Sequence, residues 1–207
     1  FRADARVGEP FECQRYLGIP EARLRVVYET VPSEFWAPWD GGEAAATRAR
    51  LGLGPDDLVV LHVGSNDARK NLVTVCRVVS RLRERRMRGV RLLKVGAPFG
   101  AAERSALSRE GIPHDVARHA GRVDVAELVR IYRAATVLLY PSWYEGFCRP
   151  VVEAMAAGLP VVASRTGAIP EVAASAAALY APHDAEGMAE RIAAIAEAPR
   201  QRQAMAA

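Results

Sequence analysis

The pattern of apolar and polar residues becomes regular from about residue 52. Short apolar runs bounded by glycine or proline alternate there with segments in which apolar residues recur at helical spacing. Runs of the first kind predict strands, and segments of the second kind predict helices. The expected strands cover residues 58–63, 90–95, 114–120, 136–140, 161–164 and 176–180. The expected helices cover residues 71–86, 101–110, 125–135, 150–157 and 185–198.

Several of the expected strands are nearly continuous apolar runs rather than apolar at every second position, as in Leu58 to Val63 with His62 as the one polar residue. Such strands are buried on both faces, which is typical of a parallel sheet. Strict alternation of strands and helices with short connections then predicts an α/β fold, a doubly wound parallel sheet of the Rossmann-like type. The first 40 residues are irregular apart from a candidate strand over 24–28, and a short helix is expected over 43–51.

Composition and charge exclude several classes of protein. Half of the 207 residues are apolar and a quarter are charged, which indicates a globular chain with a sizeable core rather than disorder. The net charge of +4 is too small to indicate a nucleic-acid partner. No apolar run approaches the roughly 18 residues of a membrane span. The first residues do not resemble a signal peptide.

Cysteine usage indicates a reducing compartment. The three cysteines, Cys13, Cys76 and Cys148, form no Cys-x-x-Cys pair. They therefore predict neither a disulfide framework nor a four-thiolate zinc site. We expect a cytoplasmic protein.

Candidate binding residues follow the first two expected strands, at the edge where an open parallel sheet binds its ligand. These residues are Gly64, Ser65, Arg69, Lys70, Lys94 and Gly96. Glycine permits close backbone approach, and donors at a helix N-terminus attract anions. Lys70 and Lys94 are the only lysines in the chain, and both fall on this edge. The sequence therefore predicts an anion site here from the pair, whereas either lysine alone is more often a surface residue.

The loop and helix after the fourth expected strand hold two glutamates eight residues apart, Glu145 and Glu153. The helix begins with Pro150 in its first turn and stops at Gly158, the usual arrangement of these residue types. Its free N–H groups and Lys70 suit a diphosphate, while the two carboxylates suit sugar or ribose hydroxyls. From the spacing alone, a solvated loop residue and a helix-dipole partner stay open as simpler interpretations of Glu145 and Glu153.

Several motifs of other enzyme classes are absent from the sequence. Neither Gly-x-Gly-x-x-Gly nor the Walker pattern follows the first strand, which disfavours a dehydrogenase and a P-loop ATPase. No Asp-x-Asp and no Gly-x-Ser-x-Gly occurs, and the four histidines lack metal-ligand spacing. We therefore expect no metal site and no bound cofactor.

The segment Glu145-Gly-Phe-Cys-Arg-Pro-Val-Val-Glu153, followed by Ala-Met-Ala-Ala-Gly-Leu-Pro-Val-Val-Ala-Ser and Gly167-Ala-Ile-Pro-Glu171, resembles a known family. It is similar to the donor-binding domain of the retaining GT-B glycosyltransferases of family 4, the group 1 transferases. Their E-x7-E motif matches Glu145 and Glu153. The resemblance extends from about residue 24 to residue 200. Further matches are Gly64…Arg69-Lys70-Asn71, Lys94-Val-Gly96, Gly121-Arg-Val-Asp124 and Tyr132…Tyr140-Pro-Ser142.

The resemblance implies roles for the site residues. Lys70 would bind the diphosphate, Glu145 would lie against the donor sugar as the catalytic residue, and Glu153 would bind the ribose. Backbone groups near Arg122 and Val123 would border the base. The residues whose N–H groups would reach sugar and phosphate are Gly146, Phe147, Cys148 and Arg149. The sequence departs from the family at Ser65, where an arginine is frequent, and at Cys148, where the family has glycine.

The resemblance also implies a domain organisation, with the chain as the C-terminal half of a GT-B fold. Residues 1–30 would end an acceptor domain, residues 31–51 would form the interdomain linker and the first helix, and residues 52–207 would bind the nucleotide-sugar. The C-terminal crossover helices that return to the first domain would be missing.

The implied activity is transfer of a hexose, of mannose or glucose type, from a UDP- or GDP-sugar to an acceptor hydroxyl. The leaving diphosphate would help to deprotonate the acceptor, a sugar or a lipid-linked sugar held by the first domain. The chain alone would then be inactive. The alternatives are a non-catalytic nucleotide-sugar-binding module and a phosphorylase or epimerase of the same fold. The arginine-rich stretch 81–91 would contact the cytoplasmic face of a membrane, or would simply be a solvated helix face.

Overall fold

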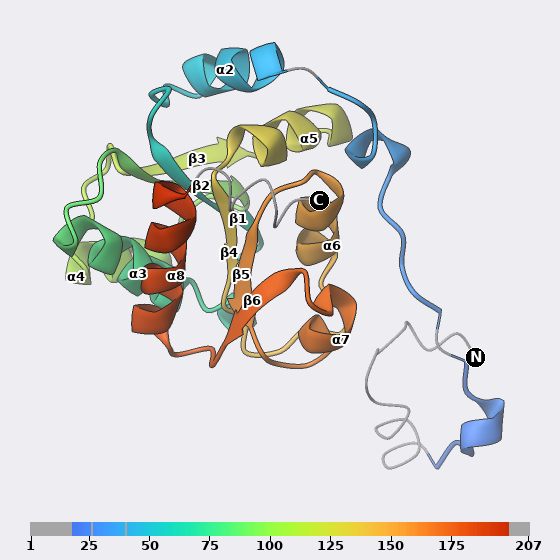
Figure 1. Cartoon of the computed structure of the whole chain (residues 1–207). Helices are drawn as coiled ribbons and strands as arrows, with labels where there is room; N and C mark the ends of the chain where they lie inside the picture. Colours follow the sequence, from blue (N-terminus) through green and yellow to red (C-terminus); the bar gives the residue numbers. More distant parts are fainter. Residues whose placement is uncertain (1–17, 26, 40, 199–207) are drawn as a thin grey trace.

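The computed structural model describes residues 18–25, 27–39 and 41–198. Within them the centre is a six-stranded sheet, all of whose neighbouring strands are parallel, in the order β3-β2-β1-β4-β5-β6 (Figure 1). The strands are β1 (Leu58–Gly64), β2 (Val90–Gly96), β3 (Ala117–Gly121), β4 (Val137–Tyr140), β5 (Val161–Ser164) and β6 (Ala177–Tyr180).

Helices cover both faces of this sheet (Figure 1). The α-helices are α2 (Gly41–Arg50), α3 (Leu72–Glu84), α4 (Ala101–Arg109), α5 (Val125–Ala134), α6 (Arg149–Ala156), α7 (Ile169–Ala173) and α8 (Ala185–Glu197). Short 3-10 turns are η1 (Glu21–Arg23), η2 (Ser33–Phe35) and η3 (Ala68–Lys70). None of the helices in the described ranges is long and apolar enough to cross a membrane.

Successive residues of one strand point to opposite faces of the sheet, so β1 contributes to two separate cores. Val59 and Leu61 belong to the core shared with α5, α6 and α7. Val60 belongs to the core shared with α3, α4 and α8. Burial on both faces explains why the strand is apolar on both faces rather than at alternate positions, with buried His62 as the exception.

The strand order reverses between β1 and β4, because β2 and β3 lie on one side of β1 and β4 to β6 lie on the other. In a doubly wound sheet this switch point leaves a crevice at the carboxyl ends of the two strands. The connections after β1 and β4 both open onto that crevice. They carry Lys70 and Glu145 respectively.

The predicted fold class, a doubly wound parallel sheet, is confirmed, and so are most of the predicted strands and helices. All six strands and the helices predicted from residue 43 onward form, with ends that shift by a few residues. β3 begins at Ala117 rather than at residue 114, because residues 114–116 form a turn in which Val116 N donates to Pro113 O. α7 was not predicted. The candidate strand over 24–28 is wrong for the described residues of that stretch, and Val26 lies outside them.

Candidate active site

A cleft of about 610 Å³ lies at the carboxyl ends of β1 and β4. Its lining residues are Glu29, Val63, Gly64, Ser65, Lys70, Leu128, Tyr140, Glu145, Phe147, Cys148, Arg149, Pro150 and Glu153. The fold therefore brings the loop after β1, the loop after β4 and the first turns of α6 to one place. These are the segments in which the sequence predicted a diphosphate ligand and two carboxylates.

Lys70 and Glu145 form an ion pair at the centre of the cleft. Nζ of Lys70 lies 2.7 Å from Oε1 of Glu145, and the side chains are 16% and 9% exposed. The same ammonium donates to the Tyr140 hydroxyl at 2.6 Å, and Ser142 Oγ donates to the same carboxylate oxygen at 2.8 Å. Two groups from β4 and its loop thus fix a cation and an anion that both face the cleft.

The conformation of Lys70 is set by its place at the end of η3. Asp67 accepts from Arg69 N and begins this turn, and Asn71 ends it in the left-handed conformation at φ 53°. The Asn71 side chain donates to Pro141 O at 2.9 Å and to Pro182 O at 2.8 Å. The loop that carries Lys70 is therefore tied to the loop that carries Glu145, and the two residues are positioned together.

Glu153 lies on the α6 wall of the cleft and is 6% exposed. Its Oε2 accepts from the hydroxyl of Tyr132 at 2.8 Å, and Tyr132 is fully buried in α5. Its Oε1 lies 3.9 Å from Nε of Arg149, whose guanidinium is also 3.7 Å from Glu29. Oε2 is therefore held by Tyr132, whereas Oε1 has only the longer contact with Arg149 among the described residues, and Glu153 lines the cleft.

The residue before α6 has an unusual backbone. Cys148 caps the helix at φ 76°, the left-handed region in which a side chain is strained. Cys148 and Arg149 line the cleft together with Lys70 and Glu145, at a helix N-terminus of the kind that favours anions. Within the first turn, Pro150 has no N–H and Val151 N donates to Cys148 O at 3.0 Å. Burial raises the pKa of the Cys148 thiol, so the thiol stays protonated and is not a nucleophile.

Two glycines, Gly167 and Gly96, pack directly against the backbone of the loops that form the site. A Cβ on Gly167 would lie 2.3 Å from Glu145 O, and a Cβ on Gly96 would lie 2.4 Å from Gly64 O. Each glycine therefore lets a site loop pack directly on a neighbouring backbone. Ala168 N, just before α7, also donates to Glu145 O at 3.0 Å. Gly167 belongs to the family-like segment Gly167-Ala-Ile-Pro-Glu171, from which no site residue was predicted.

Lys94 has a different environment from the one the sequence suggested. Its side chain is buried, and its ammonium donates to Gly64 O at 3.2 Å and to Ala97 O. Burial lowers its pKa. Lys94 therefore braces the backbone at the end of β1 and after β2 and does not line the cleft, so a direct contact with ligand is not supported.

Other predicted residues also lie outside the cleft lining. Arg69 forms an ion pair with Asp67 at 3.0 Å and is about half exposed. Arg122 is exposed, and Val123 packs against the core beside α5. Gly146 lies between two lining residues without lining the cleft itself. Their proposed contacts with phosphate, base and sugar stay predictions.

The structure adds residues that the sequence reasoning did not place in the site. Tyr140, Ser142 and Tyr132 hold the side chains of Lys70, Glu145 and Glu153. The signal in the sequence is the family-like match Tyr132…Tyr140-Pro-Ser142, which indicates the family without indicating what these side chains contact. Glu29 enters the lining from the segment before the domain, and nothing in the sequence pattern pointed to it.

A buried histidine lies under the cleft floor. The ring of His62 stacks on the ring of Tyr140 at 5.6 Å, and its Nδ1 donates to Leu139 O at 3.2 Å. Burial lowers the pKa of His62 to about 4, so the imidazole is neutral at physiological pH. In the part of the chain that the structure describes, no group of three His, Cys, Asp or Glu side chains could hold a metal ion.

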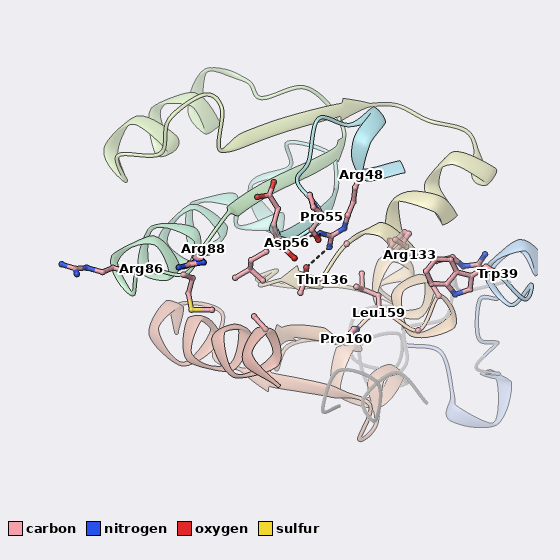
Figure 2. Close-up of a pocket in the computed structure, with 18 residues that line it drawn as sticks. Trp39, Arg48, Pro55, Asp56, Arg86, Arg88, Arg133, Thr136, Leu159 and Pro160 are labelled. Carbon is pink, nitrogen blue, oxygen red and sulfur yellow. Dashed lines mark hydrogen bonds between the residues drawn. The ribbon is translucent and has the colours of Figure 1, made fainter. Parts of the chain in front are cut away.

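A second cavity, of about 670 Å³, lies at the opposite edge of the sheet, where β1, β4 and β5 begin (Figure 2). Arg48 of α2 crosses it and donates to Ala134 O at 2.8 Å, to Pro55 O at 2.9 Å and to Thr136 Oγ1 at 3.3 Å. None of the predicted site residues lines it. Arg48 there fastens α2 to the start of the sheet, so the cavity is structural although it is the larger of the two.

The chain has a Rossmann-like α/β fold with a cleft lined by two glutamates, and comparison with known proteins gives the family. Residues 44–207 match the family model for glycosyl transferases group 1. The chain belongs to this family.

Curated proteins similar to this chain are also named as glycosyltransferases. The chain is 36% identical over 178 residues to a D-inositol 3-phosphate glycosyltransferase of Streptomyces bingchenggensis, a match covering 78% of this chain and 37% of that protein. It is 34% identical over 203 residues to D-inositol 3-phosphate glycosyltransferase 2 of Catenulispora acidiphila, covering 92% and 46%. The chain therefore spans less than half the length of these relatives.

Solved structures agree on the fold. WaaG, a glycosyltransferase involved in lipopolysaccharide biosynthesis, superposes with a TM-score of 0.81 at 20% identity, covering 93% of this chain and 52% of that one. Anabaena HepE in complex with UDP-glucose gives a TM-score of 0.82 at 20% identity, covering 98% and 55%. The architecture is thus that of one half of a GT-B glycosyltransferase.

Proposed function

We propose that this chain is the donor-binding half of a retaining glycosyltransferase of family 4. It would serve the transfer of a hexose, of mannose or glucose type, from a UDP- or GDP-sugar to an acceptor hydroxyl. The observation that carries the proposal is the convergence of Lys70, Glu145 and Glu153 with the N-terminus of α6 in one cleft. The HepE complex with UDP-glucose supports a nucleotide-sugar donor, and the names of the curated relatives support glycosyl transfer.

Each group has a separate chemical task in this proposal. Lys70 and the free N–H groups of α6 bind the diphosphate, and Glu153 accepts hydrogen bonds from the ribose hydroxyls. Glu145 lies beside the donor sugar. As the bond from sugar to phosphate breaks, negative charge develops on the diphosphate, and the ammonium of Lys70 stabilises that charge. A diphosphate oxygen takes the proton of the acceptor hydroxyl, so no side-chain base is required of this half.

The wider assignments belong to the same proposal. Residues 1–30 end an acceptor domain, residues 31–51 link it, and residues 52–207 bind the donor. The acceptor, a sugar or a lipid-linked sugar, is held by the other half, so this chain alone transfers no sugar. Donor binding uses no metal ion, and the protein acts in the cytoplasm.

Membrane contact through residues 81–91 has less support. Arg81 and Arg85 pair with Glu186 and Glu190 of α8, and Arg83 donates to Gly111 O. These arginines therefore join α3 to neighbouring elements of the domain. A contact with the cytoplasmic face of a membrane stays a prediction.

The first experiment measures thermal unfolding with UDP, GDP and ADP. A ligand present at about 100 times its dissociation constant adds roughly 2.7 kcal/mol to the free energy of unfolding. We expect a large shift with UDP or GDP and little with ADP. The absence of any nucleotide-dependent shift would refute the proposal. Transfer assays on the full-length parent, with and without inorganic phosphate and with the sugar isotopically labelled, separate a transferase from the phosphorylase, the epimerase and the non-catalytic module.

A further inference from the structure

One oxygen of the Glu153 carboxylate is engaged by the protein, and the other is available for a ligand. Its Oε2 accepts from the Tyr132 hydroxyl at 2.8 Å, whereas among the described residues its Oε1 has only the 3.9 Å contact with Arg149. A carboxylate held at one oxygen has a fixed plane, so the direction of its second oxygen is fixed as well. The direction in which Glu153 can accept a hydrogen bond is therefore set by Tyr132.

Tyr132 is suited to this task. It is fully buried in α5, and its hydroxyl reaches Pro150 O only at 3.4 Å, so Glu153 is its close partner. Burial and the neighbouring carboxylate raise its pKa well above the ordinary tyrosine value. The hydroxyl consequently stays protonated, and so remains a donor, at physiological pH.

Tyr132 is in turn held by the segment that precedes the domain. The ring of Phe35, in η2, meets the Tyr132 ring edge-on at a centroid distance of 5.5 Å and an angle of 71°. Phe35 is 1% exposed. Such aromatic pairs add to the stability gained from burial alone.

The neighbouring Arg133 fixes the same segment. Its Nη2 donates to the carbonyl oxygens of Glu34, Phe35 and Ala37, and its guanidinium lies 5.5 Å from the ring centroid of Trp39. Adjacent residues of α5 therefore bind the linker and the ribose-facing carboxylate. A continuous set of contacts runs from Phe35 through Tyr132 to Glu153.

We propose that Tyr132 is the positioning residue for nucleotide recognition, aiming Glu153 at the ribose hydroxyls, and that Phe35 of the linker holds Tyr132 in place. This inference rests on the proposed function, because it takes Glu153 as the ribose ligand. It goes further in assigning ribose recognition partly to a segment outside the nucleotide-binding domain. A displaced linker would then weaken nucleotide binding without touching the nucleotide.

The test compares UDP with 2′,3′-dideoxy-UDP by calorimetry, and GDP with its dideoxy form if GDP gives the larger thermal shift. The wild type should prefer the ribonucleotide by roughly tenfold or more, as expected for hydrogen bonds to a charged group. Tyr132→Phe should weaken UDP binding about five- to tenfold and leave dideoxy-UDP unchanged. Phe35→Leu should act in the same direction with a smaller effect.

Tyr140→Phe is the matched control, since Tyr140 is equally buried and its hydroxyl binds Lys70 instead. It should weaken UDP and dideoxy-UDP equally and spare uridine. In a Glu153→Ala background, Tyr132→Phe should have no further effect, because the two residues act as one unit. Thermal unfolding of each variant checks that the fold is kept.

The outcomes separate the inference from the proposed function. If the wild type does not prefer UDP over dideoxy-UDP, the assignment of Glu153 to ribose fails, and the inference fails with it. If the wild type shows the preference and Glu153→Ala removes it, but Tyr132→Phe weakens both ligands equally or neither, the proposed function stands. The positioning role is then overturned.

Discussion

Nζ of Lys70 lies 2.7 Å from Oε1 of Glu145, so the side chain proposed to bind the diphosphate is ion-paired with the carboxylate proposed to face the sugar. Tyr140 and Ser142 hold the same pair. A diphosphate that binds to Lys70 would therefore compete with the Glu145 carboxylate, which is already paired with the ammonium. In the proposed role, the ion pair orients the ammonium of Lys70 in the free protein and lowers its affinity for the diphosphate.

Glu145→Gln should raise the affinity for UDP or GDP about two- to fivefold, because it replaces a charged competitor by a neutral one and charge-assisted hydrogen bonds are roughly twice as strong. Calorimetry measures the change. Glu29→Gln is the control, since Glu29 lines the same cleft without contacting Lys70. A tenfold loss of affinity in Glu145→Gln would show that the ion pair supports phosphate binding rather than opposing it.

His62 makes stability depend on pH. Burial lowers its pKa in the folded protein to about 4, against roughly 6.5 in the unfolded chain. The unfolded chain thus binds more protons between these values, and stability falls as the pH drops from 6.5 towards 4. The loss from this group is on the order of 3 kcal/mol. Urea unfolding across this range should show a shallower dependence in His62→Gln, whereas the exposed His114→Gln should behave like the wild type.

Gly167 and Gly111 have similar backbones, with φ at 53° and 60°, but different surroundings. A Cβ on Gly167 would meet Glu145 O at 2.3 Å, and a Cβ on Gly111 would meet nothing within 4 Å. Gly111→Ala should therefore cost only the backbone strain, about 1 kcal/mol. Gly167→Ala should cost about 3 kcal/mol, because the loop that carries Glu145 must move. Equal costs in chemical denaturation would mean that this contact does not constrain the loop.

EDTA should leave the affinity for the nucleoside diphosphate unchanged. Lys70 and the N-terminus of α6 supply positive charge to the diphosphate, and the described residues include no three-carboxylate or histidine cluster for a cation. Calorimetry with EDTA-treated protein, repeated with added Mg²⁺ or Mn²⁺, checks this. A strict requirement for either ion would count against the assigned diphosphate site.

The strands were predictable because burial on both faces leaves an unambiguous apolar run, as in β1 and β5. α7 was not, since its five residues are too short to show a helical period. Lys70, Glu145 and Glu153 could be assigned to one edge because parallel strands all end there. The strands, and the edge of the sheet at which these three residues lie, both follow from the order of segments along the chain.

The support of the site could not be predicted, because it depends on side chains that meet only after packing. Tyr132 reaches Glu153 from another helix, and Phe35 reaches Tyr132 from 97 positions earlier in the sequence. Lys94 occupies the expected edge, yet its side chain turns inward to two carbonyl oxygens. Position at a strand end fixes the neighbourhood of a residue and leaves its partners undetermined.

The most direct test of the donor-site assignment measures binding of a nucleoside diphosphate and of the free nucleoside to Lys70→Ala and Glu153→Ala by calorimetry. Lys70 should contact only phosphate, so Lys70→Ala should weaken the diphosphate by roughly 1.5–3 kcal/mol and leave the nucleoside unchanged. Glu153 should contact the ribose, so Glu153→Ala should weaken both ligands. Equal weakening of both ligands by Lys70→Ala, or no effect of Glu153→Ala on either, would contradict the assignment.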